Sequence, residues 1–197
     1  MRKQATYTYQ SQFLEMCSDI ASKKTLSDLL TENFPGEWGS EPTENDKIKV
    51  IRTTNFTNEG KLDLTDVVER SIDSKKVAKK HLKKGDIILE RSGGTKENPV
   101  GRVVIFEEDG EYMFNNFTQL LRPNEDVNST YLFYYLLTSY NVNKASMRAM
   151  ASQTTGIQNL NMSDYLAKII ELPSDDVQTQ FEAIYRQADK SKYYELN

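Results

Sequence analysis

Five short strand-like runs between residues 47 and 121 constrain the fold of this chain more than any other feature. They lie at 47–52, 86–91, 101–106, 112–114 and 118–121. Short runs of apolar side chains bounded by glycine and other turn residues are typical of strands. The connection at 107–110 ends in Asp-Gly, the pair that tight hairpin turns favour. It predicts a hairpin between the third and fourth runs.

Helical patterns surround these strands. Residues 11–20 place Phe13, Cys17 and Ile20 at steps of four and three, the spacing of a helix that buries one stripe. Residues 75–82 can form a short helix capped by Ser74, and residues 129–140 begin at the N-cap residue Ser129. The helix at 129–140 is apolar almost all round, so we expect it to be buried. A polar loop is expected at 151–161, followed by a brief apolar run at 169–172.

The C-terminal residues 175–197 predict a long helix that starts at Ser174 or Asp175. Its apolar side chains repeat at steps of four, three and four, the rhythm of a coiled-coil seam, and they are Val177, Phe181, Ile184 and Ala188. At about 1.5 Å per residue such a helix extends about 35 Å, which is too far to pack wholly on a small domain. We therefore expect it to pack against the N-terminal helix around Phe13 and Cys17, and we consider that it also binds a second chain.

Together these patterns predict an α+β fold: a mixed, mostly antiparallel and β-rich domain with flanking helices and a long C-terminal helix of coiled-coil type. A chain of 197 residues is long enough for one domain with a real core. It has 38% hydrophobic and 27% charged residues, a balance typical of globular proteins in water. No apolar run approaches 18 residues and the first ten residues are polar, so we expect no membrane segment and a cytoplasmic location.

The residue inventory argues against several kinds of catalysis. Cys17 and His81 are the one cysteine and the one histidine of the chain, which excludes an internal disulfide, thiolate zinc sites and Ser-His-Asp or Cys-His catalysis. Neither a phosphate-binding G-x-x-x-x-G-K motif nor a dinucleotide-binding G-x-G-x-x-G motif occurs. Asp46, Glu59 and Lys61 could hold Mg²⁺ in a small nuclease. Such short matches are common by chance, so the sequence favours recognition over catalysis.

Charge is distributed unevenly along the chain. The formal net charge is −4, yet residues 70–102 hold ten basic and four acidic residues, a local charge of +6. A basic stretch of this kind can hold a polyanion such as DNA by its phosphates, although charge runs are also often plain solvated surface. We predict backbone contacts from its cations and from a glycine pair that allows close approach: Lys75, Lys76, Lys79, Lys80, Lys83, Lys84, Arg91, Gly93, Gly94, Lys96 and Arg102.

Two polar segments have side chains suited to reading base edges. Arginine pairs with guanine, and asparagine and glutamine pair with adenine. The first segment directly follows a strand-like run, and the second follows the buried helix. The predicted base-reading residues are Arg52, Thr53, Thr54, Asn55, Gln153, Thr154, Thr155, Gln158 and Asn159.

Five blocks of the sequence, in order, carry a resemblance to a known family. They are "SQFLEMCSDI" (11–20), "TLSDLL" with "GEWGSE" (25–41), "GDIILERSGG" with "PVGRVVIF" (85–106), "NNFTQLLRPN" (115–124) and "QTTGIQNLNMSDYLAKIIELP" (153–173). The chain resembles the DNA-specificity subunit of type I restriction-modification systems. Each block is unspecific by itself, and the set covers most of the chain.

The resemblance implies a target recognition domain at 23–173, preceded by the end of a spacer helix at 1–22 and followed by a spacer or dimerisation helix at 174–197. It implies that the chain reads half of a bipartite site in double-stranded DNA, without catalysis of its own. Methyltransferase subunits, a restriction subunit and a possible homodimer are the expected protein partners. S-adenosylmethionine, ATP and Mg²⁺ are expected on the partner subunits, and no cofactor or metal is expected in this chain.

Full-length members of this family have two recognition domains, whereas this sequence holds one. It is therefore expected to be either a half-subunit that dimerises through its helices or a part of a longer subunit. Two other interpretations stay open: the Mg²⁺-dependent nuclease, and an interaction module that acts through its coiled-coil helix without binding DNA.

Overall fold

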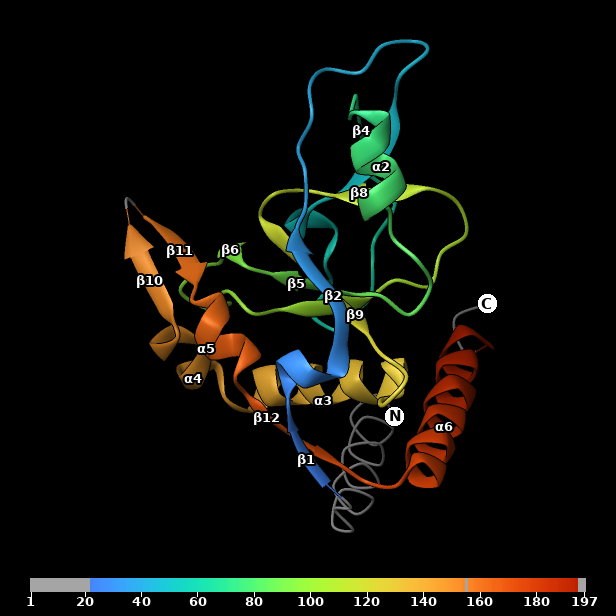
Figure 1. The fold of residues 1–197 in the computed structure, drawn as a ribbon, viewed down its shortest axis with the longest axis vertical. Helices are drawn as coiled ribbons and strands as arrows, with labels where there is room; N and C mark the ends of the chain where they lie inside the picture. Colours follow the sequence, from blue (N-terminus) through green and yellow to red (C-terminus); the bar gives the residue numbers. More distant parts are fainter. Residues whose placement is uncertain (1–21, 155, 195–197) are drawn as a thin grey trace.

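The described strands form four sheets, in which every strand pair except β3-β8 is antiparallel (Figure 1). A computed structural model describes residues 22–154 and 156–194. The largest sheet has the order β2-β9-β5-β7, formed by Leu30–Pro35, Thr118–Pro123, Ile87–Glu90 and Val103–Ile105. A second sheet, β4-β3-β8, consists of Val68–Arg70, Ile48–Ile51 and Tyr112–Phe114. The smaller sheets are β10-β11-β6 (Ala151–Thr154, Ile157–Leu160, Ser92–Gly93) and β1-β12 (Ser22–Thr25, Ile169–Leu172).

Five α-helices and two 3₁₀ turns complete the described part of the chain. The α-helices are α2 (Ser74–Lys80), α3 (Ser129–Val142), α4 (Lys144–Ala149), α5 (Met162–Leu166) and α6 (Asp175–Tyr194). The 3₁₀ turns are η1 (Leu26–Leu29) and η2 (Thr53–Asn55). The predicted α+β, mostly antiparallel fold is confirmed. Each predicted strand-like run contains a strand of the structure.

The central sheet lies between two layers. Ile87 and Leu89 of β5 pack with the side chains of α3, whereas Ile88 between them packs with Ile51 and Phe114 of the β4-β3-β8 sheet. Figure 1 shows α3 on one side of the sheet, and β8 and α2 on the other. Successive residues of a strand point to opposite faces, so a strand covered on both faces must be apolar throughout. This requirement explains the unbroken apolar run at 87–89.

Two helix starts lie one residue earlier than predicted. Asn128, not Ser129, caps α3 by accepting a 3.0 Å hydrogen bond from the Tyr131 amide. Asp73, not Ser74, caps α2. Asparagine and aspartate cap as well as serine, so the residue pattern alone could not distinguish neighbouring candidates. Helix α2 also ends at Lys80 rather than at residue 82, because the Leu82 amide donates to the Tyr112 carbonyl (2.9 Å).

The predicted hairpin at 107–110 is wrong. Strand β7 pairs with β5, whereas β8 pairs in parallel with β3, so the chain changes sheets across this segment. Tyr112, Met113 and Phe114 are all buried. A strand that is buried on both faces is held by its neighbours in the interior, and this overrides the local preference of Asp-Gly for a hairpin.

The predicted polar loop at 151–161 is also wrong, because most of it is the hairpin β10-β11. Gln153 lies opposite Gln158, and Gly156 in the turn has φ +85°. Thr155 lies outside the described residues. The hairpin has few apolar side chains and so lacks the alternation that would have indicated strands. It is held partly through β6, which pairs with β11.

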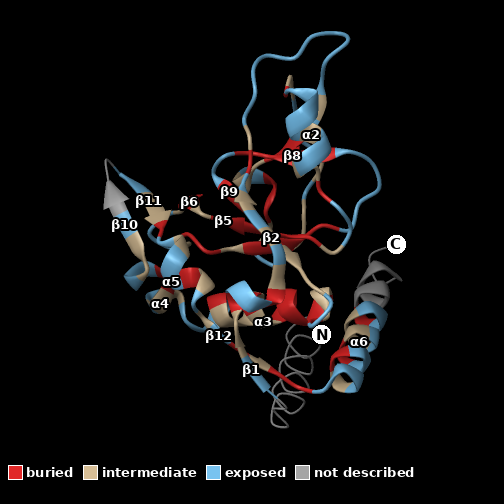
Figure 2. Cartoon of the chain, viewed as in Figure 1, coloured by how far each residue is buried: buried red, intermediate tan, exposed pale blue. Residues whose placement is uncertain are grey.

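Helix α6 is confirmed as a long helix, and it packs on α3. Phe181 is 2% exposed, and its ring centroid lies 5.1 Å from that of Tyr134 and 6.0 Å from that of Tyr131. In Figure 2 the buried positions of α6 face the rest of the domain. Ala188 is buried, and Val177 and Ile184 are half-buried. The predicted seam therefore packs within the chain at Phe181, and a coiled-coil partner for it stays a prediction.

Some of the predictions made from the sequence concern residues that the structure does not describe. The predicted helix at 11–20, with Phe13, Cys17 and Ile20, lies outside the described residues. The boundaries of the spacer helices at 1–22 and 174–197 also stay predictions. Among the described helices, none has the length and apolar character needed to cross a lipid bilayer.

Replacing Phe181 with alanine should destabilise the whole domain, because the ring fills space between α6 and α3. The expected loss in the free energy of unfolding is about 3 to 5 kcal/mol, the usual range for a buried phenylalanine. Urea unfolding followed by circular dichroism measures it. Gln180→Ala, an exposed position on the same helix, serves as the control and should change stability by less than about 0.5 kcal/mol. Equal stability of both variants would show that α6 does not belong to the core.

Candidate nucleic-acid interface

Three turns meet at one edge of the sheets. Strands β3 and β8 are parallel, so their C-terminal ends lie together, and the Asn115 amide donates to the Ile51 carbonyl (2.9 Å). The turn after β8 also contacts the end of β5, because the Phe117 carbonyl accepts from the amides of Arg91 (2.9 Å) and Ser92 (3.1 Å). We call the group formed by residues 52–55, 91–99 and 115–117, with the β10-β11 hairpin, the loop cluster.

A buried ion pair joins two of these turns. The Glu90 carboxylate is 2% exposed and binds Arg102 through Nε (2.7 Å) and Nη2 (3.0 Å). Arg102 also donates to the carbonyls of Thr53 (3.2 Å) and Phe56 (3.4 Å), and Glu90 accepts from the Gly94 amide (3.4 Å). Hydrogen bonding to Glu90 raises the pKa of Arg102 although burial opposes it. Most of the guanidinium donors are thus engaged within the protein, which makes Arg102 less suited to bind a phosphate, and its predicted phosphate contact stays a prediction.

The glycine pair shapes the loop at 91–99, which we call the glycine loop. Gly93 and Gly94 have φ +111° and +64°, values that side chains with a Cβ rarely adopt. A Cβ on Gly94 would lie 2.7 Å from the Val100 amide nitrogen, so this glycine is needed to close the loop. A Cβ on Gly93 would meet no atom nearer than Glu90 Oε1 at 3.6 Å. Close approach of DNA to this backbone stays a prediction.

The far end of the glycine loop is anchored on α3. The Tyr140 hydroxyl donates to the Pro99 carbonyl (2.9 Å), and burial raises the pKa of Tyr140 to about 12. Tyr140 therefore stays a protonated donor at any physiological pH. Lys144 donates to Asn98 Oδ1 (2.8 Å) beside a cavity of about 150 Å³ that Arg102 and Tyr140 also line. The loop is rigidly held at both ends.

The hairpin contacts the glycine loop through side chains that were predicted to read bases. Gln158 is half-buried, and its Oε1 accepts from the Val100 amide and its Nε2 donates to the Thr95 carbonyl, both at 3.4 Å. Asn159 Oδ1 accepts from the Ser92 hydroxyl (2.8 Å). The Gln158 bonds are at the long limit for hydrogen bonds. A role in base reading for Gln153, Thr154, Gln158 and Asn159 stays a prediction, and Thr155 lies outside the described residues.

In the turn at 52–55, two of the predicted base readers are engaged in structural bonds. Asn55 is 3% exposed; its Oδ1 accepts from the Arg52 amide (2.8 Å), and its Nδ2 donates to the carbonyls of Asp63 (2.9 Å) and Asp66 (3.0 Å). Arg52 binds Asp66 (3.0 Å). A buried and fully bonded amide cannot reach a base edge, which contradicts the prediction for Asn55. Asparagine closes turns with its own side chain, and the sequence does not distinguish this role from base reading.

The predicted basic zone is divided. Lys76 and Lys80 both bind Glu37, at 3.0 and 2.7 Å, and these bonds lower the pKa of Glu37. Lys84 binds Asp109 at 2.8 Å. Lys75, Lys79 and Lys83 are exposed and have no carboxylate partner among the described residues. Helix α2 lies in the upper part of Figure 1, whereas the β10-β11 hairpin lies at the left.

The glycine loop has its own cations, two of which the sequence reasoning missed. Arg91 and Lys96 were predicted, whereas Arg148, which donates to the Lys96 carbonyl (2.8 Å), and Lys144 were not. None of the four has a carboxylate within ion-pair distance in the part of the chain that the structure describes. Glu97 is the one acidic residue of the loop at 91–99. Both residues belong to the segment "NKASMR" after the buried helix. This segment is far from the glycine loop in sequence, so the sequence alone did not indicate that its cations lie beside that loop.

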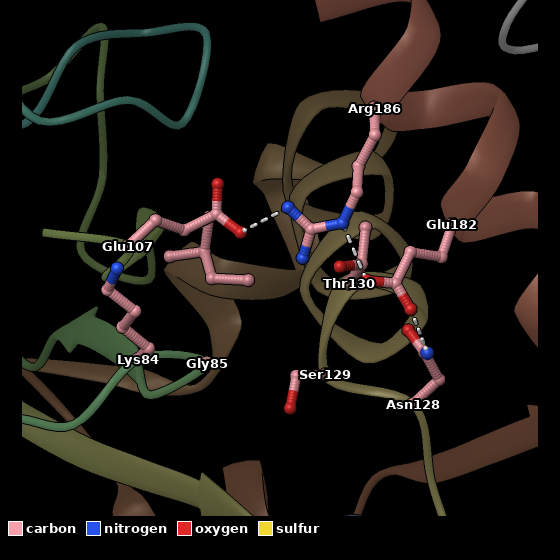
Figure 3. Close-up of a pocket in the computed structure, with 9 residues that line it drawn as sticks. Lys84, Gly85, Glu107, Asn128, Ser129, Thr130, Glu182 and Arg186 are labelled. Carbon is pink, nitrogen blue, oxygen red and sulfur yellow. Dashed lines mark hydrogen bonds and ion pairs between the residues drawn. The ribbon is translucent and has the colours of Figure 1, made fainter.

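A second cavity, of about 370 Å³, lies between α6 and the segments around residues 84–85, 105–107 and 128–130 (Figure 3). Arg186 crosses it and binds Glu182 (2.7 Å) and Glu107 (3.1 Å), and Asn128 donates to Glu182 (2.6 Å). Burial alone would raise the pKa of Glu182, but the hydrogen bonds from Asn128 and Arg186 outweigh it and lower that pKa. The charged groups of this cavity therefore neutralise one another and orient α6.

The residues of the alternative nuclease site do not converge. Asp46 accepts from the Ser71 hydroxyl, whereas Gly60, next to Glu59, packs on Phe133 of α3. Lys61 lies over the Tyr185 ring of α6 (5.7 Å). In the described ranges, 22–154 and 156–194, no group of three or more histidine, cysteine, aspartate or glutamate side chains could hold a metal ion. The arrangement gives this alternative no support.

Comparison with protein families shows which family the chain belongs to. A family model described as the type I restriction modification DNA specificity domain matches residues 22–192. The chain belongs to this family. A search of curated proteins finds no significant match.

Solved structures agree with this assignment at the level of the fold. The chain is similar to the S subunit of a type I restriction-modification system from M. genitalium, with 18% identity over 90% of this chain and 40% of that one, at a TM-score of 0.53. It is also similar to the HsdS subunit from Thermoanaerobacter tengcongensis, with 14% identity over 96% and 46% of the two chains, at a TM-score of 0.58. A third match, to a structure of type I complex assembly and conformational transition, has 14% identity over 98% and 49%, at a TM-score of 0.56. The chain thus spans less than half the length of each of these proteins.

Replacing Glu90 with glutamine should destabilise the loop cluster, because Arg102 would stay partly buried without a counter-charge. Removing one member of a buried pair costs about 3 to 5 kcal/mol. Urea unfolding should show a loss in this range, and Glu97→Gln, the same change at an exposed site, should show almost none. A Glu90→Gln variant as stable as the Glu97→Gln control would contradict the structural role of the pair.

Proposed function

We propose that the chain is a specificity subunit that reads one half of a bipartite site in double-stranded DNA. The observation that carries the proposal is the convergence of the glycine loop, the turn at 115–117 and the hairpin β10-β11 at one edge of the domain, beside cations without carboxylate partners. Turns presented by a rigid sheet are well suited to enter a DNA groove.

Two kinds of contact divide the work in this proposal. Arg91, Lys96, Lys144 and Arg148 hold phosphates and so position the domain without reading sequence. Polar tips of the loop cluster reach the base edges and discriminate between base pairs. The exposed Lys75 and Lys79 of α2, and Lys83 just after it, are available for phosphates farther along the duplex. Lys76, Lys80 and Lys84 are less suited to this role because each already binds a carboxylate.

The chain works without catalysis of its own in this proposal, and directs methyltransferase and restriction subunits to the site. S-adenosylmethionine, ATP and Mg²⁺ would then be bound by those subunits. Helix α6 is the proposed docking element, because its inner face is anchored on α3 and its outer face is exposed. The second half-site would be read by a second copy of the chain or by a further domain. A cytoplasmic location accords with this role.

The salt dependence of binding tests the proposed DNA function. The affinity of the full chain for a DNA duplex should fall steeply as salt rises, with a log-log slope of about −0.9 for each phosphate contact. The triple variant Arg91→Ala, Lys96→Ala, Arg148→Ala removes up to three contacts, so the slope should be shallower by about 2.7. Fluorescence anisotropy over a range of salt concentrations measures both slopes.

A matched variant with the same change in net charge provides the control. Lys23, Lys24 and Lys47 form exposed ion pairs with Glu171, Asp126 and Glu69. Their replacement by alanine should leave the slope unchanged. A salt-independent affinity of the unmodified chain would contradict DNA binding, and equal effects of the two triple variants would contradict the placement of the contacts.

A further inference from the structure

The turn at 115–117 exposes two side chains that the sequence pattern did not indicate as base-reading residues. Asn116 is exposed, and Phe117 is 38% exposed although it is a large apolar residue. All other phenylalanines of the described residues are buried or half-buried. In Figure 1 this turn lies on the same side of the molecule as β6 and the β10-β11 hairpin. The turn thus presents an exposed aromatic ring beside an exposed amide.

The backbone beneath these two side chains is rigidly held. The Thr118 hydroxyl donates to the Asn115 carbonyl (2.7 Å), and Thr118 is fully buried. The Phe117 carbonyl accepts two hydrogen bonds from the start of the glycine loop, and the Asn115 amide is bonded to the end of β3. The turn is therefore fixed on both sides, so Asn116 and Phe117 are presented at its tip with little freedom to lose on binding.

The root of the turn contains an unsatisfied polar atom. Asn115 is 7% exposed, and its Oδ1 has no hydrogen-bond partner within the described part of the chain. An unsatisfied buried acceptor costs about 1 to 3 kcal/mol. A buried polar atom without a partner calls for an explanation, and a role in function is one such explanation. This observation is independent of the exposure of Phe117 and indicates the same turn.

The surroundings of the turn suit duplex DNA. Arg91 directly adjoins it through the backbone, Lys96 lies farther along the glycine loop, and Arg148 of α4 donates to the Lys96 carbonyl. Ile157 of the hairpin, 42% exposed, follows Gly156 and precedes the residue that pairs with Gly93. The surface thus combines phosphate-binding cations at its sides with one amide and apolar groups at its centre. A surface that reads an A·T pair in the major groove needs this combination, because adenine offers N6 and N7 to an amide and thymine offers a methyl group.

We propose that Asn116 and Phe117 determine specificity by reading an A·T base pair in the major groove, Asn116 through adenine N6 and N7 and Phe117 through the thymine methyl group. The inference rests on the proposed DNA-reading function and assigns its base-reading residues. It replaces Asn55, whose amide is buried, as the asparagine that contacts adenine.

Selection from a random-sequence duplex pool by the full chain provides the test. The unmodified chain should enrich a motif with a required A·T pair. Asn116→Ala and Phe117→Ala should each lower the preference at that pair about tenfold, with preferences elsewhere in the motif retained. Phe117→Leu, which keeps apolar bulk, should retain part of the preference. Ile169→Ala, an exposed apolar residue on β12, is the control and should select the unmodified motif.

Modified bases in the enriched duplex test the atoms directly and require no folding of a variant. Uracil in place of the required thymine removes the methyl group, and 7-deazaadenine removes N7. The unmodified chain should bind both duplexes more weakly, whereas Phe117→Ala should be insensitive to uracil and Asn116→Ala insensitive to 7-deazaadenine.

The outcomes separate this inference from the proposed function. Enrichment of a motif that both variants select unchanged would overturn the roles of Asn116 and Phe117 and leave DNA reading intact. A uniform loss of affinity for all duplexes would also overturn them, since it would indicate backbone contact or a non-specific wedge. Failure of the unmodified chain to enrich any motif would overturn the proposed function and this inference together.

Discussion

The ion pair between Glu90 and Arg102 is the interaction on which the rest of the recognition surface depends. Glu90 ends a strand of the central sheet, and Arg102 precedes the neighbouring strand. Their pairing places one guanidinium where it can also bind the carbonyls of Thr53 and Phe56, while the carboxylate accepts from Gly94. Buried ion pairs add little net stability compared with apolar packing. What this pair provides is a fixed spacing between turns that are far apart in sequence.

A sheet buried on both faces gives these turns a rigid base. Strand β5 contributes alternate side chains to two cores, one with α3 and one with the β4-β3-β8 sheet. The parallel pairing of β3 and β8 brings the ends of two strands to one edge, and the Phe117 carbonyl connects that edge to the end of β5. Shape is thus determined by the buried strands, and recognition is left to exposed tips that can vary without changing the core.

Much of the fold was predictable because buried strands and helices have recognisable patterns of apolar residues in the sequence. The apolar runs that became β3, β5, β7, β8, β9 and β12, and the buried helix α3, follow directly from hydrophobic pattern. The hairpin β10-β11 was missed because its strands carry few apolar residues, and the hairpin at 107–110 was wrongly predicted because β8 pairs with a strand distant in sequence. Local patterns do not record long-range pairing.

The candidate site was predictable only in part, for reasons of chemistry. The sequence identified the segments 52–55, 91–102 and 153–159, which the structure brings together, but not which side chains are free. Arg102 and Asn55 have the right groups for DNA and are engaged within the protein, as are Lys76 and Lys80 through Glu37. Lys144, Arg148 and Phe117 were not predicted for the site. Lys144 and Arg148 follow the predicted helix at 129–140, and Phe117 lies between two predicted strands.

Amide hydrogen exchange with and without double-stranded DNA tests the central claim most directly, namely that the loop cluster is the surface that meets the duplex. At low ionic strength the account predicts slower exchange on DNA binding in residues 91–99, 115–117 and 156–160. Helix α6 and the strands β1 and β12 should exchange at unchanged rates. Protection confined to α2 and the long connection at 36–47, with unchanged exchange in the loop cluster, would contradict the account.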